Sequence, residues 1–565
     1  MENDSQGFGG EVVLGRRSES DEKIRVHFDG VLLNAPELRK ETAEMPSAIV
    51  SRLYEEQGFR CFEMLNGPFA IAIEDCRDEC RRLILARDHH GQMGLCYKFA
   101  DGKVVYSAEA KRGGTLDIEA LGTYLSLGYI PAPMTIYKEW RKVPSGSVAV
   151  FDGTSVKVER YWTPDLSQAC ELSFEDAVSK ARELIEKAVR RCLDYDSDAG
   201  VLLSGGIDSN VVMWTARKLL GTAPQSFTVG FTTDAFDERG LAAMSAKAAG
   251  SEHLTRQVEP ADYTIVKNIL SARPEPFADS SLMPDAMAMR FAAEHKKTVL
   301  TGDGGDEIFG GYRRYRAMAM RDAMGEFPAR VGGKALGLAM RLFSQGGNPR
   351  GRVATTRRMA HALSLPLIES YASFQELFSV SDVRSLMPAF AEVSGSYYDM
   401  WKTLFDACPA KGVAAKCNYI DLLTYLPDDG CLKEGLAASG TGLTVLSPLL
   451  DMDVTRFALS LPLEFRHIRR EGKRILRAIA SKFLPDDLMN IPKRGFGMPL
   501  AEWLRGPWAH LMNECIASKG TWDVENCLNT NILSSVVRCH NAAVADCGAG
   551  LWAINCLKEA GTLNR

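Results

Sequence analysis

The sequence predicts two domains of different fold class: an α+β domain with stacked antiparallel sheets over residues 1–165, and an α/β domain with a parallel, doubly wound sheet over residues 170–565. Two patterns carry this prediction. In the first part, short runs rich in Val, Ile and Phe alternate with turn residues, which is typical of antiparallel strands. From residue 174 onward, helical periodicity alternates with short apolar runs, and beyond Tyr312 the pattern is mostly helical up to Arg565.

The first domain contains strands and turns in regular succession. Asp101-Gly102 is a dipeptide that favours a tight turn, because glycine adopts positive φ without steric cost. We expect helices over residues 46–57 and 118–126, and a linker over residues 163–170. The expected strands cover residues 24–28, 69–73, 82–86, 104–107 and 147–151.

The second domain begins with a helical pattern. Over residues 174–193, apolar positions recur about every 3.6 residues among Ala, Glu, Lys and Arg. An apolar strand over residues 199–203 follows, then a glycine turn and a helix over residues 210–219. Further strands are expected over residues 227–231 and 298–301. Strands that alternate with helices in this way indicate a parallel sheet.

Composition and charge exclude several classes of protein. Hydrophobic residues make up 46% and charged residues 25% of the 565 residues, which excludes disordered and collagen-like chains. The 67 Lys and Arg residues against 72 Asp and Glu residues give a net charge of −5, so no basic footprint predicts nucleic-acid binding. No run approaches about 20 apolar residues, so we expect no membrane partner.

The 14 cysteines point to a reducing compartment. They are scattered between Cys61 and Cys556 without a C-x-x-C pair, which argues against a zinc ribbon and against a dithiol redox motif. The first 17 residues lack the pattern of a secretory signal. We therefore expect reduced thiols in a cytoplasmic protein.

The strongest functional signal is the motif S-G-G-x-D-S at residues 204–209, directly after the apolar strand. Glycines let the backbone approach a polyanion, and the N–H groups at a helix N-terminus bind phosphate oxygens. The alternative is an ordinary tight turn between a strand and a helix. No G-x-x-x-x-G-K-[ST] motif occurs, so the lysine that contacts a transferring γ-phosphate is missing. The motif resembles the PP-loop of the ATP pyrophosphatase superfamily, whose members cleave ATP between its α and β phosphates.

A second motif narrows the resemblance. Residues 301–312 read T-G-D-G-G-D-E-I-F-G-G-Y, in which three acidic side chains lie among five glycines. Such an arrangement is unfavourable without a cation, although a solvated acidic turn is the alternative. The motif resembles the synthetase domain of asparagine synthetases. Further segments similar to that family cover residues 128–133, 227–231, 275–281, 425–429 and 492–497.

The resemblance extends from about Ile24 to Trp552 and implies ATP and Mg²⁺ as cofactors. It makes Asp208 and Asp306 the Mg²⁺ ligands, directly or through pyrophosphate oxygens. The residues that it assigns to the nucleotide are Leu203, Ser204, Gly205, Gly206, Asp208, Ser209, Val229, Gly302 and Asp303.

Two residues receive catalytic roles from the same resemblance. Lys493 becomes the cation that stabilises charge developing at the acyl centre, for which the alternative is a surface lysine in a basic turn. Asp303 occupies the position of an acidic residue in the family and becomes the acid/base for the amine.

The resemblance also implies that the first domain has the fold of an N-terminal-nucleophile (Ntn) hydrolase, a glutaminase whose second residue is Cys. Here Glu2 stands at that position. Asp29 replaces the Asn of the oxyanion segment before Gly30, and Ser47 replaces the Asp that would bind the glutamine amine. We therefore expect a domain that keeps its fold and has stopped hydrolysing glutamine.

The amino-acid site departs from the family pattern as well. After Lys433 the family carries two arginines and two carboxylates that could hold a small zwitterion. Neutral or apolar residues stand at those positions, namely Gly435, Leu436, Thr444 and Leu446. This substitution predicts a larger and less polar substrate than free aspartate.

Together these features predict an ATP-dependent, AMP-forming amide ligase that acts on a small-molecule or peptide carboxylate and an amine, without glutamine hydrolysis. The amine would belong to the same substrate, as in β-lactam-forming and lasso-peptide-cyclising relatives, or to a second substrate, or be free ammonia. Two alternatives stay open: a glutamine-hydrolysing asparagine synthetase with a misread N-terminus, and a catalytically silent scaffold subunit. Assembly as a homodimer is also left open.

Overall fold

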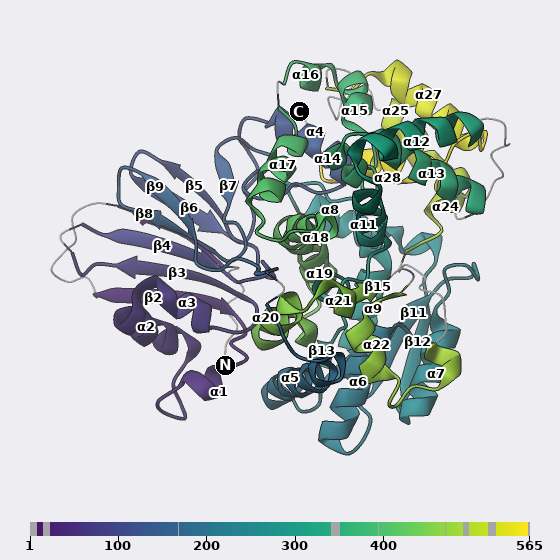
Figure 1. Cartoon of the computed structure of the whole chain (residues 1–565). Coiled ribbons are helices and arrows are strands. Elements are labelled where there is room, and N and C mark those ends of the chain that lie inside the picture. The colour runs from purple at the N-terminus through teal and green to yellow at the C-terminus, as the bar shows by residue number, and fades with distance from the viewer. Residues whose placement is uncertain are drawn as a thin grey trace.

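The computed structural model describes residues 8–14, 23–78, 80–167, 169–340, 351–393, 395–468, 471–489, 497–517 and 527–562. Its N-terminal part is a sandwich of two antiparallel sheets (Figure 1). The four-stranded sheet has the order β1 (Gly9–Val13), β6 (Lys103–Ser107), β5 (Cys96–Ala100) and β7 (Trp140–Lys142). The five-stranded sheet has the order β2 (Ile24–Gly30), β3 (Phe69–Asp75), β4 (Arg82–Arg87), β8 (Ser147–Phe151) and β9 (Val156–Arg160).

Strand β4 shows why the inner strands of this sandwich read as unbroken apolar runs. Leu83 and Leu85 pack between the two sheets, whereas Ile84 and Ala86 pack on the other face, beneath helices α2 (Pro46–Gln57) and α3 (Cys61–Met64). Since side chains alternate between the faces of a strand, a sheet that is covered on both faces needs apolar residues at every position. The remaining helices of this part are α1 (Ala35–Leu38) and α4 (Ile118–Leu127), with the short 3₁₀ turn Gly58–Arg60.

The sheet of the second part of the chain is parallel throughout, with the strand order β12-β11-β10-β13-β14. Its strands are β10 (Gly200–Leu202), β11 (Ser226–Gly230), β12 (His253–Gln257), β13 (Thr298–Leu300) and β14 (Thr444–Leu446). From β10 the chain adds strands on one side and then returns to add β13 on the other. Ligands of open α/β sheets bind at such a reversal, beyond the carboxyl ends of the strands.

Helices cover this sheet and form most of the C-terminal part (Figure 1). They are α5 (Phe174–Tyr195), α6 (Ile207–Leu220), α7 (Arg239–Ala249), α8 (Tyr263–Ser271), α9 (Leu282–Ala293), α10 (Gly305–Phe309), α11 (Arg313–Met324), α12 (Glu326–Met340), α13 (Arg352–Ser364), α14 (Leu367–Ala372), α15 (Val380–Leu386), α16 (Pro388–Ala391), α17 (Tyr397–Ala407), α18 (Val413–Leu423), α19 (Cys431–Ala438), α20 (Met452–Ser460), α21 (Leu463–Arg466), α22 (Arg474–Ala480), α23 (Asp486–Met489), α24 (Leu500–Arg505), α25 (Ala509–Ala517), α27 (Thr530–Asn541) and α28 (Gly548–Glu559). Within the described ranges, no helix is both long enough and apolar enough to cross a membrane.

The predicted fold class is confirmed for both parts of the chain. One boundary differs in a way that matters for the site: the helix expected over residues 210–219 begins earlier, at Ile207. Gly206 takes the N-cap position, so Asp208 and Ser209 lie in the first turn of α6 and not in the loop before it.

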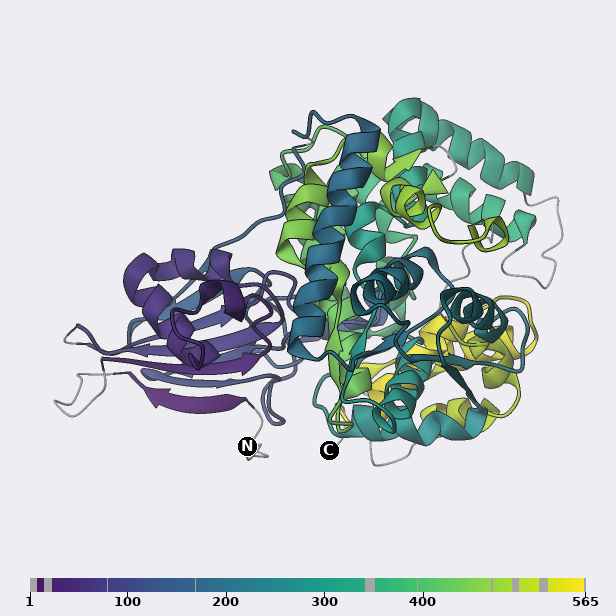
Figure 2. The same cartoon turned by 90° about the horizontal axis from the view of Figure 1, so that it is seen from below.

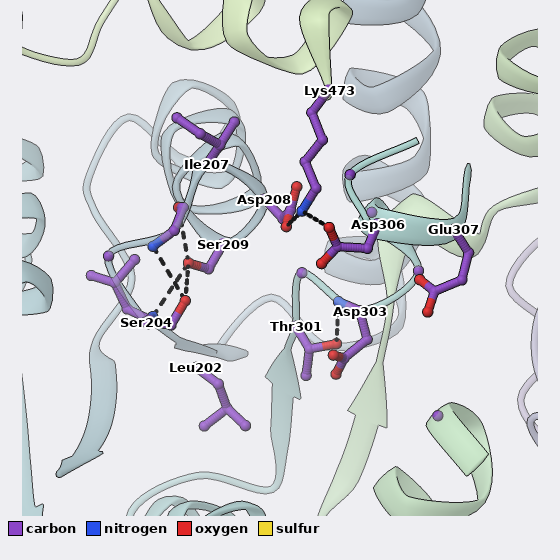
Figure 3. Close-up of a pocket in the computed structure, with 18 of the residues that line it drawn as sticks. Leu202, Ser204, Ile207, Asp208, Ser209, Thr301, Asp303, Asp306, Glu307 and Lys473 are labelled. Carbon is purple, nitrogen blue, oxygen red and sulfur yellow. Dashed lines mark hydrogen bonds and ion pairs between the residues drawn. The ribbon is translucent and has the colours of Figure 1, made fainter. Parts of the chain in front are cut away.

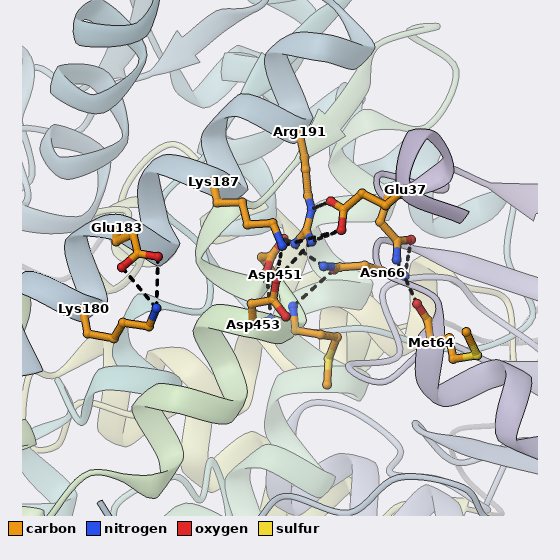
Figure 4. A network of polar contacts seen from close by, with 11 residues as sticks. Glu37, Met64, Asn66, Lys180, Glu183, Lys187, Arg191, Asp451 and Asp453 are labelled. Atoms are coloured by element: carbon orange, nitrogen blue, oxygen red, sulfur yellow. Dashed lines mark hydrogen bonds and ion pairs between the residues drawn. The ribbon is translucent and has the colours of Figure 1, made fainter. Parts of the chain in front are cut away.

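The sandwich and the larger part of the molecule meet along α5 and the segment around α20 (Figure 2). Arg191 on α5 donates to Glu37 over 2.7 Å and to Asp451 over 2.7 Å (Figure 4). Asn66 of the sandwich donates to the same Asp451 carboxylate over 2.9 Å. Because Arg191, Asn66 and Asp451 are all buried, the two parts are joined by a desolvated polar network.

Candidate functional site

A cavity of about 1000 Å³ lies beyond the carboxyl ends of β10 and β13, at the reversal of strand order. Its walls come from the loop that enters α6, from the glycine-rich segment that follows β13, and from the turn that precedes α22 (Figure 3). Every described residue to which the sequence assigned the nucleotide or Mg²⁺ lines this cavity. These residues are Leu203, Ser204, Gly205, Gly206, Asp208, Ser209, Val229, Gly302, Asp303 and Asp306.

The loop before α6 has a conformation that its glycines make possible. Gly205 has a φ of +76°, and a Cβ there would lie 2.8 Å from Cβ of Leu241. Ser204 and Ser209 hold the two ends of the loop together, with their Oγ atoms 3.2 Å apart. Because the first turn of a helix has backbone N–H groups without helical acceptors, this loop is suited to bind an anion.

Asp208 and Asp306 come together around a lysine that the sequence analysis did not single out. Lys473 Nζ lies 2.9 Å from Asp306 Oδ1 and also forms an ion pair with Asp208 (Figure 3). Lys473 is buried, and the two carboxylates outweigh its burial and raise its pKa above the usual value for a lysine. Its φ of +57° is rare for a residue other than glycine and marks a constrained backbone.

The glycines at the end of the second motif make this contact possible. A Cβ on Gly311 would overlap both the Asp306 carboxylate and the Lys473 side chain. The third acidic residue of the motif, Glu307, accepts a hydrogen bond from the Tyr312 hydroxyl over 2.7 Å. Asp306 therefore faces Asp208, while Glu307 is held by Tyr312.

The Asp208 and Asp306 carboxylates fit the chemistry of Mg²⁺, which prefers oxygen ligands and is usually held by one or two carboxylates together with substrate phosphates. Within the described part of the chain, no group of three or more His, Cys, Asp or Glu side chains could hold a metal ion by itself. The remaining positions around a Mg²⁺ ion would therefore fall to phosphate oxygens and water.

The other end of the cavity is acidic. Lys433 on α19 lies 3.2 Å from the Asp285 carboxylate and donates to the Ser281 hydroxyl over 2.8 Å. Burial raises the pKa of Asp285 to about 6, although Lys433 opposes this shift. Glu434, the next residue on α19, is buried near Asp303 and accepts from the Thr301 hydroxyl over 3.1 Å.

The four positions that the sequence analysis expected to form a less polar substrate pocket lie away from this cavity. Gly435, Leu436, Thr444 and Leu446 are absent from its described lining. Leu436 and Leu446 pack into the core and Gly435 is exposed, because α19 presents Lys433 and Glu434 to the cavity instead. The expected less polar pocket is thus not built from these four positions.

The predicted catalytic Lys493 lies outside the described residues, as does Glu2. The catalytic role of Lys493 stays a prediction.

In the sandwich, Asp29 lies near the end of β2, and burial raises its pKa above the usual value of an aspartate. Gly30 beside it has a φ of +120°, and a Cβ there would overlap the backbone of Pro68. Ser47 lies in the first turn of α2.

Comparison with known proteins identifies the family. The model of the asparagine synthase family matches residues 180–561, and the model of a glutamine amidotransferase domain matches residues 17–162. A putative glutamine-hydrolyzing asparagine synthetase of Mycobacterium tuberculosis is 26% identical over 560 residues, which cover 94% of this chain and 83% of that protein. Glutamine-hydrolyzing asparagine synthetase 1 of Bacillus subtilis is 26% identical and covers 95% of this chain and 85% of its own length.

A fungal relative is named as an amidase. Amidase chyE of Penicillium rubens is 25% identical over 504 residues, which cover 81% of this chain and 73% of that protein. A solved glutamine phosphoribosylpyrophosphate amidotransferase of Bacillus subtilis matches 51% of this chain and 63% of its own chain, with 11% identity and a TM-score of 0.18. The asparagine synthase model matches residues 180–561, which is more than half of this chain. This chain therefore belongs to the asparagine synthase family.

Proposed function

We propose that this protein is an ATP-dependent, AMP-forming amide ligase that activates a carboxylate as an acyl-adenylate and passes the acyl group to an amine. The observation that supports this proposal best is the meeting of three segments in one cavity: the loop before α6, the glycine-rich segment after β13, and Lys473. The match to the asparagine synthase family model also supports an ATP-dependent, amide-forming enzyme.

The residues of this cavity divide the chemistry between them. Backbone N–H groups at the start of α6 bind the phosphates, and the apolar wall at Val229 and Met289 receives the adenine. Asp208 and Asp306 would hold Mg²⁺ together with phosphate oxygens, and the ion would supply positive charge that favours pyrophosphate as a leaving group. Lys473 lies between these two carboxylates in the same cavity, where its cation would stabilise the charge that develops during carboxylate attack.

A screen for pyrophosphate release across carboxylic acids tests this proposal. Wild-type protein should release pyrophosphate from ATP with at least one acid, and Asp208→Ala should abolish that release while leaving the thermal unfolding transition in place. Asp194→Ala is the matched control, because Asp194 is exposed on α5, away from the cavity. Release by Asp208→Ala at the wild-type rate would contradict the assignment.

We further propose that glutamine is not the nitrogen source. Asp29 and Ser47 support this, wherever the chain begins, because a carboxylate at position 29 would repel an oxyanion and Ser47 cannot neutralise the glutamine amine. Incubation with amide-labelled ¹⁵N-glutamine, ATP, Mg²⁺ and the activated acid should give no glutamate above background and no labelled product.

The second candidate is a glutamine-hydrolysing asparagine synthetase. The match to the glutamine amidotransferase model and the descriptions of the bacterial relatives favour it. Glutamate production together with ¹⁵N-labelled asparagine in the same experiment would establish this function and overturn the first proposal on nitrogen supply.

A further inference from the structure

Helix α12 presents a row of apolar side chains to solvent. Phe327, Val331 and Leu338 have exposed fractions of 78%, 51% and 66%. Their spacing of four and seven residues places all three on one face of the helix, since 3.6 residues make one turn. These three residues are called the apolar row below. Single exposed apolar residues are ordinary, but a contiguous set of them marks an interaction surface.

The opposite face of α12 packs against α13, which lies beside it (Figure 1). Ala329, Gly333 and Met340 are buried. Each of them follows a member of the apolar row by two residues, which is about 200° around the helix. A Cβ on Gly333 would lie 2.5 Å from the backbone nitrogen of Ser364, so the two helices approach closely there. The apolar row therefore points away from α13 and takes no part in this packing.

The two helices carry an excess of positive charge. Their single carboxylate is Glu326, whereas Lys or Arg stands at positions 330, 334, 352, 357 and 358. Glu326 accepts a hydrogen bond from Arg321 over 2.7 Å, so its charge is already compensated. Arg330 and Lys334 are exposed, and each follows a member of the apolar row by three residues, which is about 60° around the helix. Since the whole chain has a net charge of −5, this positive surface is a local feature.

The surface of an anionic lipid bilayer fits both properties of this face. A helix with apolar residues on one side and Lys or Arg beside them lies in the membrane interface, with its cations near the lipid phosphates. A second copy of the same face would bring like charges together, which opposes self-association through α12. The apolar row is also a ridge on an exposed helix, and fluid lipid can surround a ridge without a matching groove.

We propose that α12 docks this protein on an anionic membrane surface, with the apolar row among the lipid headgroups and Arg330 and Lys334 at their phosphates. The expectation of no membrane partner rested on the lack of a spanning segment, and a helix that lies in the interface needs none. Because α11 begins at the cavity with Arg313 and is about 18 Å long, docking through the next helix holds the cavity near the bilayer. This inference goes beyond the proposed ligase function and does not depend on it.

Binding to vesicles tests the proposal. The full-length protein is mixed with vesicles of phosphatidylcholine alone or of an equimolar mixture with phosphatidylglycerol, and the bound fraction is measured by sedimentation. The wild type should bind the mixed vesicles at least about 10-fold more tightly than the neutral ones, and added salt should reduce this difference. Equal binding to both kinds of vesicle, or no binding to either, would overturn the proposal.

Variants of exposed residues locate the binding to α12. Phe327→Ser combined with Leu338→Ser should lower the partition coefficient on mixed vesicles by about 10-fold or more, because less apolar surface is buried. Arg330→Gln combined with Lys334→Gln should lower it by about 5-fold for each cation and weaken its dependence on salt.

Matched controls remove the same kinds of exposed side chain elsewhere. Met45→Ser, just before α2, and Lys482→Gln, just beyond α22, should bind as the wild type does. All substituted side chains are exposed, so every variant should keep the wild-type melting temperature. Wild-type binding by both α12 variants would contradict the assignment.

Two other occupants of this face give different results. Concentration-dependent dimerisation without vesicle binding, lost in the variant with Phe327→Ser and Leu338→Ser, would assign the face to a second copy of the chain. Retention on immobilised polyglutamate without vesicle binding would assign it to an acidic protein. Either result would overturn membrane docking, whereas a wild type that binds vesicles but releases no pyrophosphate would count against the ligase function alone.

Discussion

At the scale of single residues, Lys473 compensates the negative charge of two carboxylates in the cavity. It lies between Asp208 and Asp306, and its removal would take away a cation that forms ion pairs with both carboxylates. Lys473→Met should therefore lower acid-dependent pyrophosphate exchange by about 10²–10³-fold, the scale for loss of one preorganised charge donor. Lys482→Met, which removes an exposed lysine just beyond α22, should leave exchange unchanged. Equal rates in the two variants would show that Lys473 has no part in adenylation.

The sequence could predict the acidic members of this site but not its lysine. Asp208 and Asp306 belong to local motifs, and the glycines and the preceding apolar strand of these motifs predict their role. Lys473 follows Asp208 by 265 positions, and only the folded chain brings their side chains together. The φ of +57° at Lys473, which is rare for a residue other than glycine, marks this position in the structure, but no pattern in the sequence reveals it.

At the scale of elements, the loop before α6 depends on its backbone conformation more than on its side chains. Gly205→Ala would place a methyl group against Leu241 in a positive-φ conformation, so exchange activity and ATP affinity should both fall. Gly221→Ala is the matched control, because Gly221 has a φ of +78° at the end of α6 but open space around its Cβ position. Gly221→Ala should lose about 1 kcal/mol of unfolding free energy from the strained backbone, and Gly205→Ala should lose more because of the added contact with Leu241, as measured by denaturant titration. Only Gly205→Ala should lose exchange, and an equal effect of both on exchange would contradict the proposed role of the loop.

Which elements could be predicted follows from how they are buried. Strands β3 and β4 are covered on both faces, so their composition alone reveals them. Strands β9 and β12 are half exposed and carry charged residues such as Lys157 and Arg256, so no apolar run marks them. The four positions expected to form a less polar pocket do not line the cavity, for a related reason. An alignment of motifs pointed to Gly435, whereas the orientation of α19, which depends on its tertiary contacts, presents Lys433 and Glu434.

At the scale of the whole molecule, the sandwich supports the wall of the cavity. Arg87, at the end of β4, forms a buried ion pair of 3.3 Å with Asp428, which lies in the turn Leu426–Gly430 beside the cavity residues Tyr425 and Cys431. Removing one partner of a buried pair leaves an uncompensated charge, so Arg87→Met should lower the unfolding free energy by about 3–5 kcal/mol. Lys40→Met, which removes an exposed pair with Glu56, should cost no more than about 1 kcal/mol. Similar losses for the two variants, measured by chemical denaturation, would show that the contact between the parts contributes little.

The most direct test of the account follows one oxygen atom. A substrate acid labelled with ¹⁸O in its carboxylate is incubated with ATP, Mg²⁺ and the amine, and the phosphate products are analysed by mass spectrometry. If the carboxylate attacks the α-phosphate in the cavity, one ¹⁸O atom must leave with AMP when the amine displaces it, and orthophosphate must carry none. Label in orthophosphate together with ADP formation would show an acyl-phosphate route and would contradict the proposed adenylating ligase.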